Sequence, residues 1–172
     1  LLNKAKKFLS DGASEICLLL DDIPNDFIKK FGKNASEGSY HAKLANKLAI
    51  KLNRKIFFVP RIYADELIIE SKNYLFDLSL SINKNITLIY CGKNVVSNVI
   101  KAHRQNSLSR LVKNKIVFWD NFYANDYCPR RLFIGPWKGR SEVENILINP
   151  TGMIFTDLLI LDIIGKSKKM KT

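Results

Sequence analysis

The sequence predicts an α/β protein, and two observations lead to that fold class. Short apolar runs of strand length alternate along the whole chain with longer stretches that have helical spacing. Successive strand-helix units of this kind require parallel strand pairing with right-handed crossovers. In addition, nearly every apolar run is followed by polar or aromatic residues, and (β/α)8 barrels carry their chemistry at that end of each strand.

The predicted strands are short apolar runs bounded by polar or turn residues, at 15–20, 55–59, 86–91, 115–119 and 145–148. The first is the most continuous, and we expect it to be covered on both faces, as strands of parallel sheets are. Helical spacing predicts helices over 35–52, 71–82, 96–112 and 154–164. Residues 1–9 resemble the end of an amphipathic helix, and Asn34 or Ser36 is available to cap the helix over 35–52.

The choice between an open sheet and a closed barrel rests on the strand ends. No predicted strand is followed by a glycine-rich phosphate-binding loop, and chemistry distributed over all strand ends is typical of a barrel. A whole barrel needs about 250 residues, whereas this chain has 172. We therefore predict a partial (β/α)8 TIM barrel over residues 1–165, from about the fourth strand to the eighth with the N-terminal part missing, and a basic tail at 166–172.

Composition excludes a disordered chain and leaves the partner open. The 47% hydrophobic content can form one core of ordinary size. The formal charge of +12 would attract any polyanion, but the lysines are scattered along predicted helix faces without an aromatic-interleaved basic motif. A solvated surface therefore fits better than a specific nucleic-acid partner. No apolar run reaches eighteen residues, so no membrane span is predicted.

The cysteines and histidines indicate neither a disulfide framework nor a metal site. Cys17, Cys91 and Cys128 are widely spaced, and we interpret them as buried thiols or strand-end residues, which favours a reducing compartment such as the cytoplasm. The chain begins at Leu1 rather than Met, so we expect the natural N-terminus to be missing, which leaves secretion open. His41 and His103 have no second ligand at metal spacing and are predicted to lie on helix surfaces. No cofactor is expected.

Two adjacent acids, Asp21 and Asp22, end the first apolar run and precede a proline turn. Neighbouring carboxyl groups repel each other when both are ionised, so their titrations become coupled, which suits acid/base catalysis. The alternative is that one Asp caps the following turn and the other is merely solvated.

The stretch 115–140 is rich in aromatic rings, amides and acids. Flat rings pack on the apolar face of a pyranose, and Asn and Asp side chains offer fixed donors and acceptors to its hydroxyls. Such a mixture indicates a sugar-binding loop, and the alternative is a structural loop with aromatic anchors.

Several motifs follow one another in a fixed order. They are LDDI (20–23), PRIY (60–63), GKNVV (92–96), WDNFYANDY (119–127), RLFIGP (131–136), KGR (138–140) and NP (149–150). In this order and at these separations they resemble the catalytic domain of the animal-type O-GlcNAcases, glycoside hydrolase family 84. The motifs would follow the fourth to the eighth strands of the family's barrel and cover most of the chain.

The resemblance implies a retaining β-N-acetylglucosaminidase that releases terminal β-linked N-acetylglucosamine through an oxazoline intermediate. In such substrate-assisted catalysis the 2-acetamido oxygen of the sugar attacks the anomeric carbon, so no enzyme nucleophile is needed. Asp21 would orient and polarise the acetamide, and Asp22 would be the general acid and base. The substrate would be an N-acetylglucosaminylated protein or glycan.

The resemblance also implies a set of sugar-binding residues at the strand ends: Tyr63, Val95, Trp119, Asn121, Asp126, Tyr127 and Asn149. Tyr63 would bond near the acetamide and the anomeric centre, and Trp119 would help to enclose the acetyl methyl. Asn121 would bond the reacting end of the sugar or its acetamide, while Asp126 and Asn149 would hold the distal hydroxyls. The alternatives are packing for Trp119, a helix cap for Asp126 and a turn before proline for Asn149.

Departures from the family pattern limit what the resemblance implies. The family's glycine and lysine contacts from the first strands have no counterpart, so we expect this fragment alone to be inactive. Arg61, Ile62, Ala64 and Asp65 around Tyr63 are unlike the animal enzymes, which leaves the aglycone open between a modified protein, a wall fragment and a polysaccharide such as hyaluronan. The alternative from another class is a non-catalytic basic module that holds an acidic glycan or nucleic acid on a degenerate barrel. The oligomeric state is not predicted.

Overall fold

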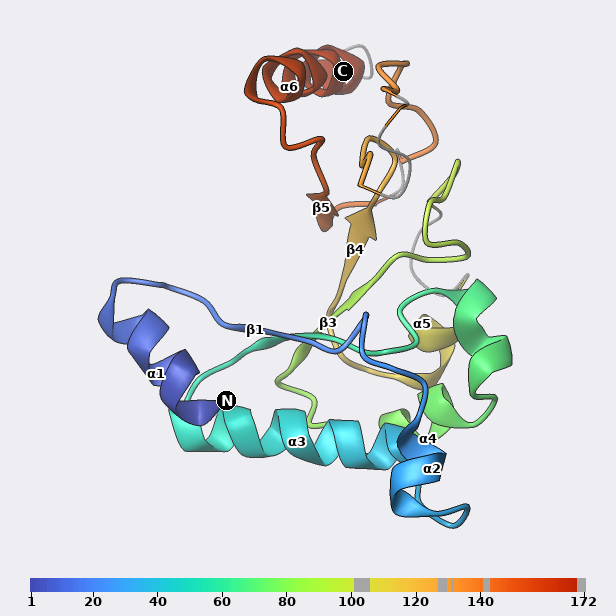
Figure 1. The fold of residues 1–172 in the computed structure, drawn as a ribbon. Coiled ribbons are helices and arrows are strands. Elements are labelled where there is room, and N and C mark those ends of the chain that lie inside the picture. Colours follow the sequence, from blue (N-terminus) through green and yellow to red (C-terminus); the bar gives the residue numbers. More distant parts are fainter. Residues whose placement is uncertain (101–105, 127–129, 131, 141–142, 170–172) are drawn as a thin grey trace.

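A computed structural model describes residues 1–100, 106–126, 130, 132–140 and 143–169 (Figure 1). At its centre lies a parallel sheet with strands in sequence order, each hydrogen-bonded to the next. The strands are β1 (Cys17–Leu19), β2 (Phe57–Val59), β3 (Thr87–Tyr90), β4 (Ile116–Asp120) and β5 (Ile146–Ile148). Each lies within its predicted range, except that β4 runs one residue further, to Asp120. The α/β class is therefore confirmed.

Helices connect the strands. They are α1 (Leu2–Ser10), α2 (Phe27–Phe31), α3 (Glu37–Leu52), the 3-10 helix η1 (Asp65–Glu70), α4 (Tyr74–Ser81), α5 (Ser107–Leu111) and α6 (Ile154–Lys169). Of the two predicted caps of α3 it is Ser36 that acts, because its hydroxyl accepts a hydrogen bond from the Ser39 amide at 3.2 Å. Within the described part of the chain, no helix is long and apolar enough to cross a membrane.

The helix predicted over 96–112 is wrong for most of its described length. Only α5 (Ser107–Leu111) is helical there, and residues 96–100 form bends and irregular chain. The Ser97 hydroxyl accepts from the Asn94 amide at 3.1 Å and donates to the Asn94 carbonyl at 2.9 Å. Such local side-chain bonds compete with helical backbone bonds. The last helix, α6, extends beyond its predicted end to Lys169. The first residues of the expected basic tail are therefore helical.

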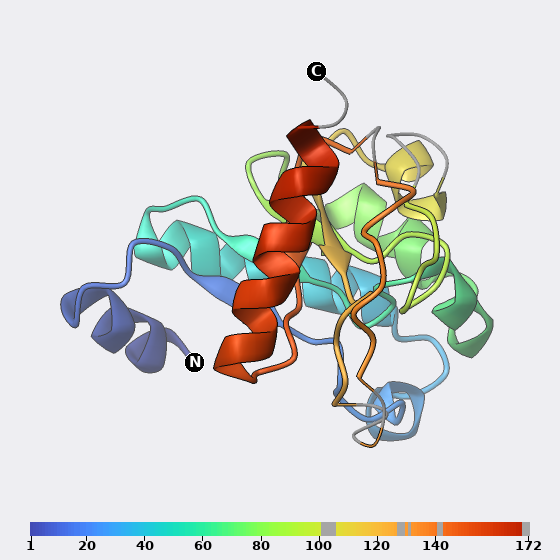
Figure 2. The same cartoon turned by 90° about the horizontal axis from the view of Figure 1, so that it is seen from above.

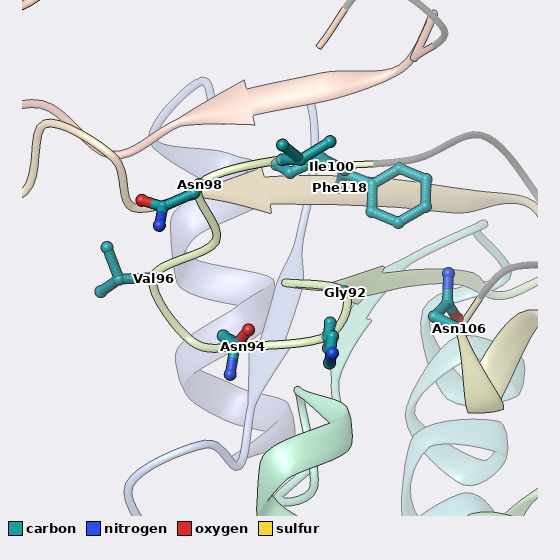
Figure 3. Close-up of a pocket in the computed structure, with 9 residues that line it drawn as sticks. Gly92, Asn94, Val96, Asn98, Ile100, Asn106 and Phe118 are labelled. Carbon is teal, nitrogen blue, oxygen red and sulfur yellow. The ribbon is translucent and has the colours of Figure 1, made fainter. Parts of the chain in front are cut away.

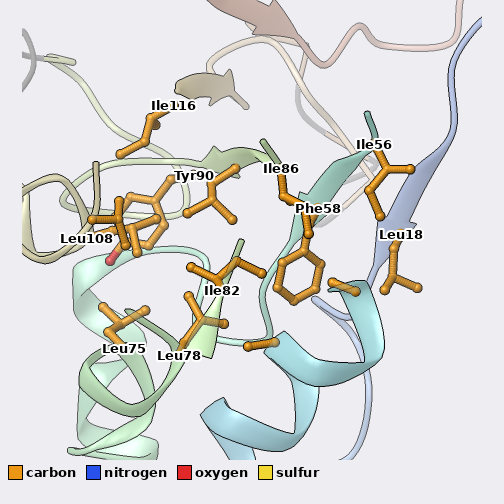
Figure 4. Packing of buried hydrophobic residues seen from close by; sticks show 14 of the residues in the cluster. Leu18, Ile56, Phe58, Leu75, Leu78, Ile82, Ile86, Tyr90, Leu108 and Ile116 are labelled. Carbon is orange, nitrogen blue, oxygen red and sulfur yellow. The ribbon is translucent and has the colours of Figure 1, made fainter. Parts of the chain in front are cut away.

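The main core lies between the sheet and the helices α3 and α4. Leu18, Phe58, Leu88 and Tyr90 from successive strands are buried against these helices (Figure 4). Burying one such side chain contributes about 1.5–3 kcal/mol. Gly38 lets α3 and α4 approach closely, since a Cβ atom there would lie 2.1 Å from the Tyr74 carbonyl oxygen.

The close approach of α3 and α4 also buries His41, which is only 4% exposed. Its Nδ1 lies 3.0 Å from the Tyr74 hydroxyl, and burial lowers the pKa of the imidazole. The expectation that His41 lies on a helix surface is therefore wrong.

The opposite face of the sheet carries a second, smaller cluster of Val59, Ile89 and Val117, with Tyr63 and Trp119 packed at its border. Figure 1 shows α6 on the side of the sheet away from α3, and in Figure 2 it crosses in front of the strands. β1 is an edge strand in the described sheet, and Leu19 is 50% exposed. The expectation that this first strand is covered on both faces is therefore wrong for the face that carries Leu19.

Candidate active site

Asp21 and Asp22 occupy the turn that directly follows β1. The strand ladder continues up to this turn, because the Leu20 amide donates to the Val59 carbonyl at 3.0 Å. Asp21 is half-buried and Asp22 is exposed. Burial raises the pKa of Asp21 above its ordinary value, a backbone hydrogen bond offsets part of that increase, and the charge of Asp22 adds to it. The two carboxyl groups are thus electrostatically coupled, as their adjacency predicts.

Tyr63 lies after β2 and within electrostatic reach of both acids. The Tyr63 carbonyl accepts a bond of 2.7 Å from the Cys91 amide, which joins this loop to the end of β3. Burial raises the pKa of the Tyr63 phenol to about 12, and the charges of Asp22 and Asp21 contribute to the increase. The phenol therefore stays protonated at neutral pH and offers a hydrogen-bond donor beside the carboxylates.

Arg61 explains how this loop is held. Its guanidinium is buried and bonds both oxygens of Glu37, at 2.6 and 2.8 Å, and one oxygen of Glu70 at 2.8 Å. The Arg61 amide also donates to the Tyr74 hydroxyl at 3.0 Å. Arg61 is therefore an internal anchor of the segment that carries Tyr63, two residues further along.

Three predicted binding residues meet at the ends of β3, β4 and β5. The side-chain amide of Asn121 donates to the Val95 carbonyl at 2.9 Å, and its oxygen accepts from the Asn149 amide at 3.1 Å. Asn121 is buried, so these bonds replace water and hold its carboxamide in one orientation. The resemblance to family 84 implied these three binding residues, and each follows one of the predicted strands.

Cys91 directly follows β3 and contacts this group of amides. Its sulfur accepts from the Asn121 amide at 3.4 Å. Burial raises the pKa of the Cys91 thiol to about 12, and the charges of Asp120 and Asp21 add to the increase. Cys91 thus contacts Asn121 through its sulfur and the Tyr63 carbonyl through its backbone amide. The sequence marked Cys91 only as a strand-end residue, and no spacing signal indicated this central position.

Asp120 lies between Trp119 and Asn121 in the chain, and Arg140 and Trp137 hold its side chain. The Asp120 carboxylate accepts bonds from Arg140 Nε at 2.8 Å, from Arg140 Nη2 at 2.9 Å and from the Trp137 indole at 2.9 Å. Arg140 also donates to the Ser97 carbonyl at 2.5 Å and to the Asn98 carbonyl. This buried ion pair secures the strand end from which Trp119 and Asn121 project.

Two predicted binding residues remain, Asp126 and Tyr127. Asp126 is exposed in the loop after β4. Tyr127 lies outside the described residues. Within the described ranges, no three His, Cys, Asp or Glu side chains come together as a metal site would require.

A hollow of about 390 Å³ lies beside the loop after β3 (Figure 3). Asn94, Val96 and Asn98 line it, together with Ile100, Asn106 and Phe118. Neither Asp21 nor Asp22 contributes to its lining. The hollow is therefore distinct from the group of strand-end side chains around Cys91.

Comparison with known proteins identifies the family. The sequence model of the β-N-acetylglucosaminidase family matches residues 1–154. The chain belongs to glycoside hydrolase family 84. The family 84 resemblance of the motifs is thereby confirmed. Protein O-GlcNAcase of Rattus norvegicus is 30% identical over 81% of the chain, and that of Mus musculus is 29% identical over the same share. The chain spans 16% of the length of each.

Solved structures show that the fold is shared with family 84 enzymes. A mutant O-GlcNAc hydrolase of Thermobaculum terrenum superposes with a TM-score of 0.81 at 22% identity, over 98% of this chain and 39% of that one. CpGH84B superposes with a TM-score of 0.74 at 20% identity, over 96% of this chain and 31% of that one.

Proposed function

We propose that the chain supplies about the fourth to the eighth strands of a (β/α)8 barrel and both catalytic acids of a retaining β-N-acetylglucosaminidase. The family and the parallel sheet in sequence order support the barrel. The observation that carries the activity is the arrangement of the strand ends: Asp21 and Asp22 follow β1 of a parallel sheet in sequence order, and Asn121 after β4 bonds Cys91, Val95 and Asn149. Acids and amides from different strand ends thus share one neighbourhood, as a sugar-binding site requires.

In this proposal, hydrolysis proceeds in two steps with the sugar as its own nucleophile. The 2-acetamido oxygen attacks the anomeric carbon, and the glycosidic bond breaks as Asp22 protonates the leaving oxygen. Asp21 accepts a hydrogen bond from the acetamide N–H and stabilises the positive charge of the oxazoline-like intermediate. Water then attacks the anomeric carbon and gives its proton to Asp22, while the bond from that carbon to the acetamide oxygen breaks and the 2-acetamido group is restored. The exposed position of Asp22 suits a group that must reach both an aglycone and water.

The neighbouring residues suit the binding roles. Tyr63 offers its phenol proton beside the carboxylates. Trp119 packs at the border of the cluster of Val59, Ile89 and Val117, where a methyl group would be desolvated. Asn121 and Asn149 present carboxamides to the sugar, and Val95, Asp126 and Tyr127 complete the proposed set. The similar rat and mouse proteins are named protein O-GlcNAcases, so we propose a protein that carries β-linked N-acetylglucosamine as the substrate.

The test is hydrolysis of aryl β-N-acetylglucosaminides by the full-length protein. Asp22→Ala should slow substrates with poor leaving groups far more than activated ones, because only the former need a proton. Asp21→Ala should slow both, and a thiazoline that mimics the oxazoline should bind tightly to the wild type. Asp11→Ala, at an exposed acid that directly follows α1, is the matched control and should leave the rates unchanged. Equal losses on both kinds of substrate in Asp22→Ala would contradict the acid assignment.

A further inference from the structure

The helix η1 begins two residues after Tyr63 and is docked on the end of β3. The Asp65 amide donates to the Gly92 carbonyl at 2.9 Å, and the Glu66 amide donates to the Lys93 carbonyl at 3.0 Å. The Asp65 carboxylate in turn accepts bonds from the Tyr90 hydroxyl at 2.7 Å and from the Ser107 amide at 3.0 Å. The first turn of η1 therefore lies at a fixed position beside the loop after β3.

The carboxylate of Glu66 binds both residues of one peptide unit in that loop. One oxygen accepts from the Val95 amide at 2.5 Å, and the other accepts from the Asn94 side-chain amide at 2.9 Å. Charge-assisted bonds of this kind are short and directional. Because the side chain of Glu66 is exposed, they add little to the stability of the fold. Their effect is to fix the orientation of the Val95 residue.

Val95 passes this constraint on to Asn121. Its carbonyl takes one hydrogen of the Asn121 side-chain amide at 2.9 Å, and the Cys91 sulfur takes the other at 3.4 Å. With both amide hydrogens committed to the protein, the free hydrogen-bonding capacity of Asn121 is on its oxygen, which also accepts from Asn149. The carboxamide can therefore meet a substrate only as an acceptor.

We propose that Glu66 is a positioning residue, which acts through Val95 to aim the carboxamide oxygen of Asn121 at a hydroxyl of the bound sugar. The inference rests on the proposed function, because it needs a sugar beside Asn121. Without Glu66 the Val95 amide loses its acceptor, and a shift of the backbone at Val95 moves the carbonyl to which Asn121 donates. A misplacement of about 1 Å at a substrate contact can lower the rate about a hundredfold.

The test is a double-mutant cycle between Glu66 and Asn121 in the full-length protein, with kcat and KM measured on an aryl β-N-acetylglucosaminide. Glu66→Ala loses both bonds and should lower kcat/KM by about tenfold to a hundredfold, whereas Glu66→Gln keeps one acceptor oxygen and should lower it less. In an Asn121→Ala background, Glu66→Ala should change the rate by less than about twofold, since the residue through which it acts is gone. Glu144→Gln, at another exposed glutamate, is the matched control for lost charge.

The thermal midpoint of both Glu66 variants should stay close to that of the wild type, which separates positioning from folding. An undiminished rate in Glu66→Ala and Glu66→Gln would overturn the inference. The same loss in the wild-type and Asn121→Ala backgrounds would also overturn it, because independent effects multiply. A wild-type protein with no activity on these substrates would instead overturn the proposed function, and the role of Glu66 would fall with it.

Discussion

The buried ion pair between Asp120 and Arg140 should be a large single contribution to the stability of the site. Both side chains are almost fully buried, at 0% and 1% exposure, with Arg140 Nε 2.8 Å from the carboxylate. Arg140→Met leaves a buried carboxylate without its cation, and breaking such a pair destabilises a protein by about 3–5 kcal/mol. The Ser97 and Lys138 carbonyls also lose their donor, which places the expected loss toward the upper end of that range.

Urea unfolding followed by circular dichroism measures this loss as a shift of the midpoint at constant slope. Lys7→Met is the matched control, because its partner Asp11 is exposed and the pair contributes less than about 1 kcal/mol. Asp120→Asn combined with Arg140→Met should cost less than the sum of the single changes, by about 0.5–3 kcal/mol, since the two groups interact directly. Equal midpoints for Arg140→Met and Lys7→Met would refute the reasoning.

Three further predictions follow from single contacts. Gly38→Ala should destabilise the fold by about 1–3 kcal/mol in the same unfolding assay, because the new methyl group would overlap the Tyr74 carbonyl; unchanged stability would contradict this packing. Tyr63→Phe should lower kcat on an aryl β-N-acetylglucosaminide about tenfold or more without loss of stability, because one donor to the reacting centre is removed; an unchanged kcat would exclude that role. Asp21 binds its proton more tightly in the folded state, so stability should fall as the pH rises from below its ordinary value of 3.8 through the raised one. Asp21→Asn should therefore be the more stable form at pH 7, by less than about 1 kcal/mol, and the difference should shrink at pH 3; a variant less stable at pH 7 would contradict this sign.

The strands could be predicted because each is a short apolar run with a polar end, a pattern that any parallel sheet imposes on its sequence. The helix over 96–112 could not, since the spacing of its apolar residues is helical while the Ser97 hydroxyl bonds both the amide and the carbonyl of Asn94. His41 was misplaced for a related reason. Its burial depends on how closely α4 approaches Gly38, and one sequence does not record which neighbour a helix face meets.

The candidate site was predictable wherever a side chain stands at a strand end. Parallel topology brings such ends to one edge of a sheet, which suffices to gather Asp21, Tyr63 and Asn121. Glu66 was not predictable, because its partners include a backbone amide and lie 28 and 29 positions away in the chain. Backbone partners leave no pattern of residue types, so such links become visible only in the folded chain.

The links described between strand ends join neighbours: Tyr63 to Cys91, Glu66 to Val95, Val95 to Asn121 and Asn121 to Asn149. A structural shift at one end of this series reaches the other end only through every intermediate contact. The displacement becomes smaller at each contact. The effects on the rate of a replacement after β1 and of one after β5 should accordingly multiply as independent factors. Replacements after adjacent strands should not combine in this way. A site assembled in this way can accept a new loop after β1 while the geometry at the end of β5 is preserved.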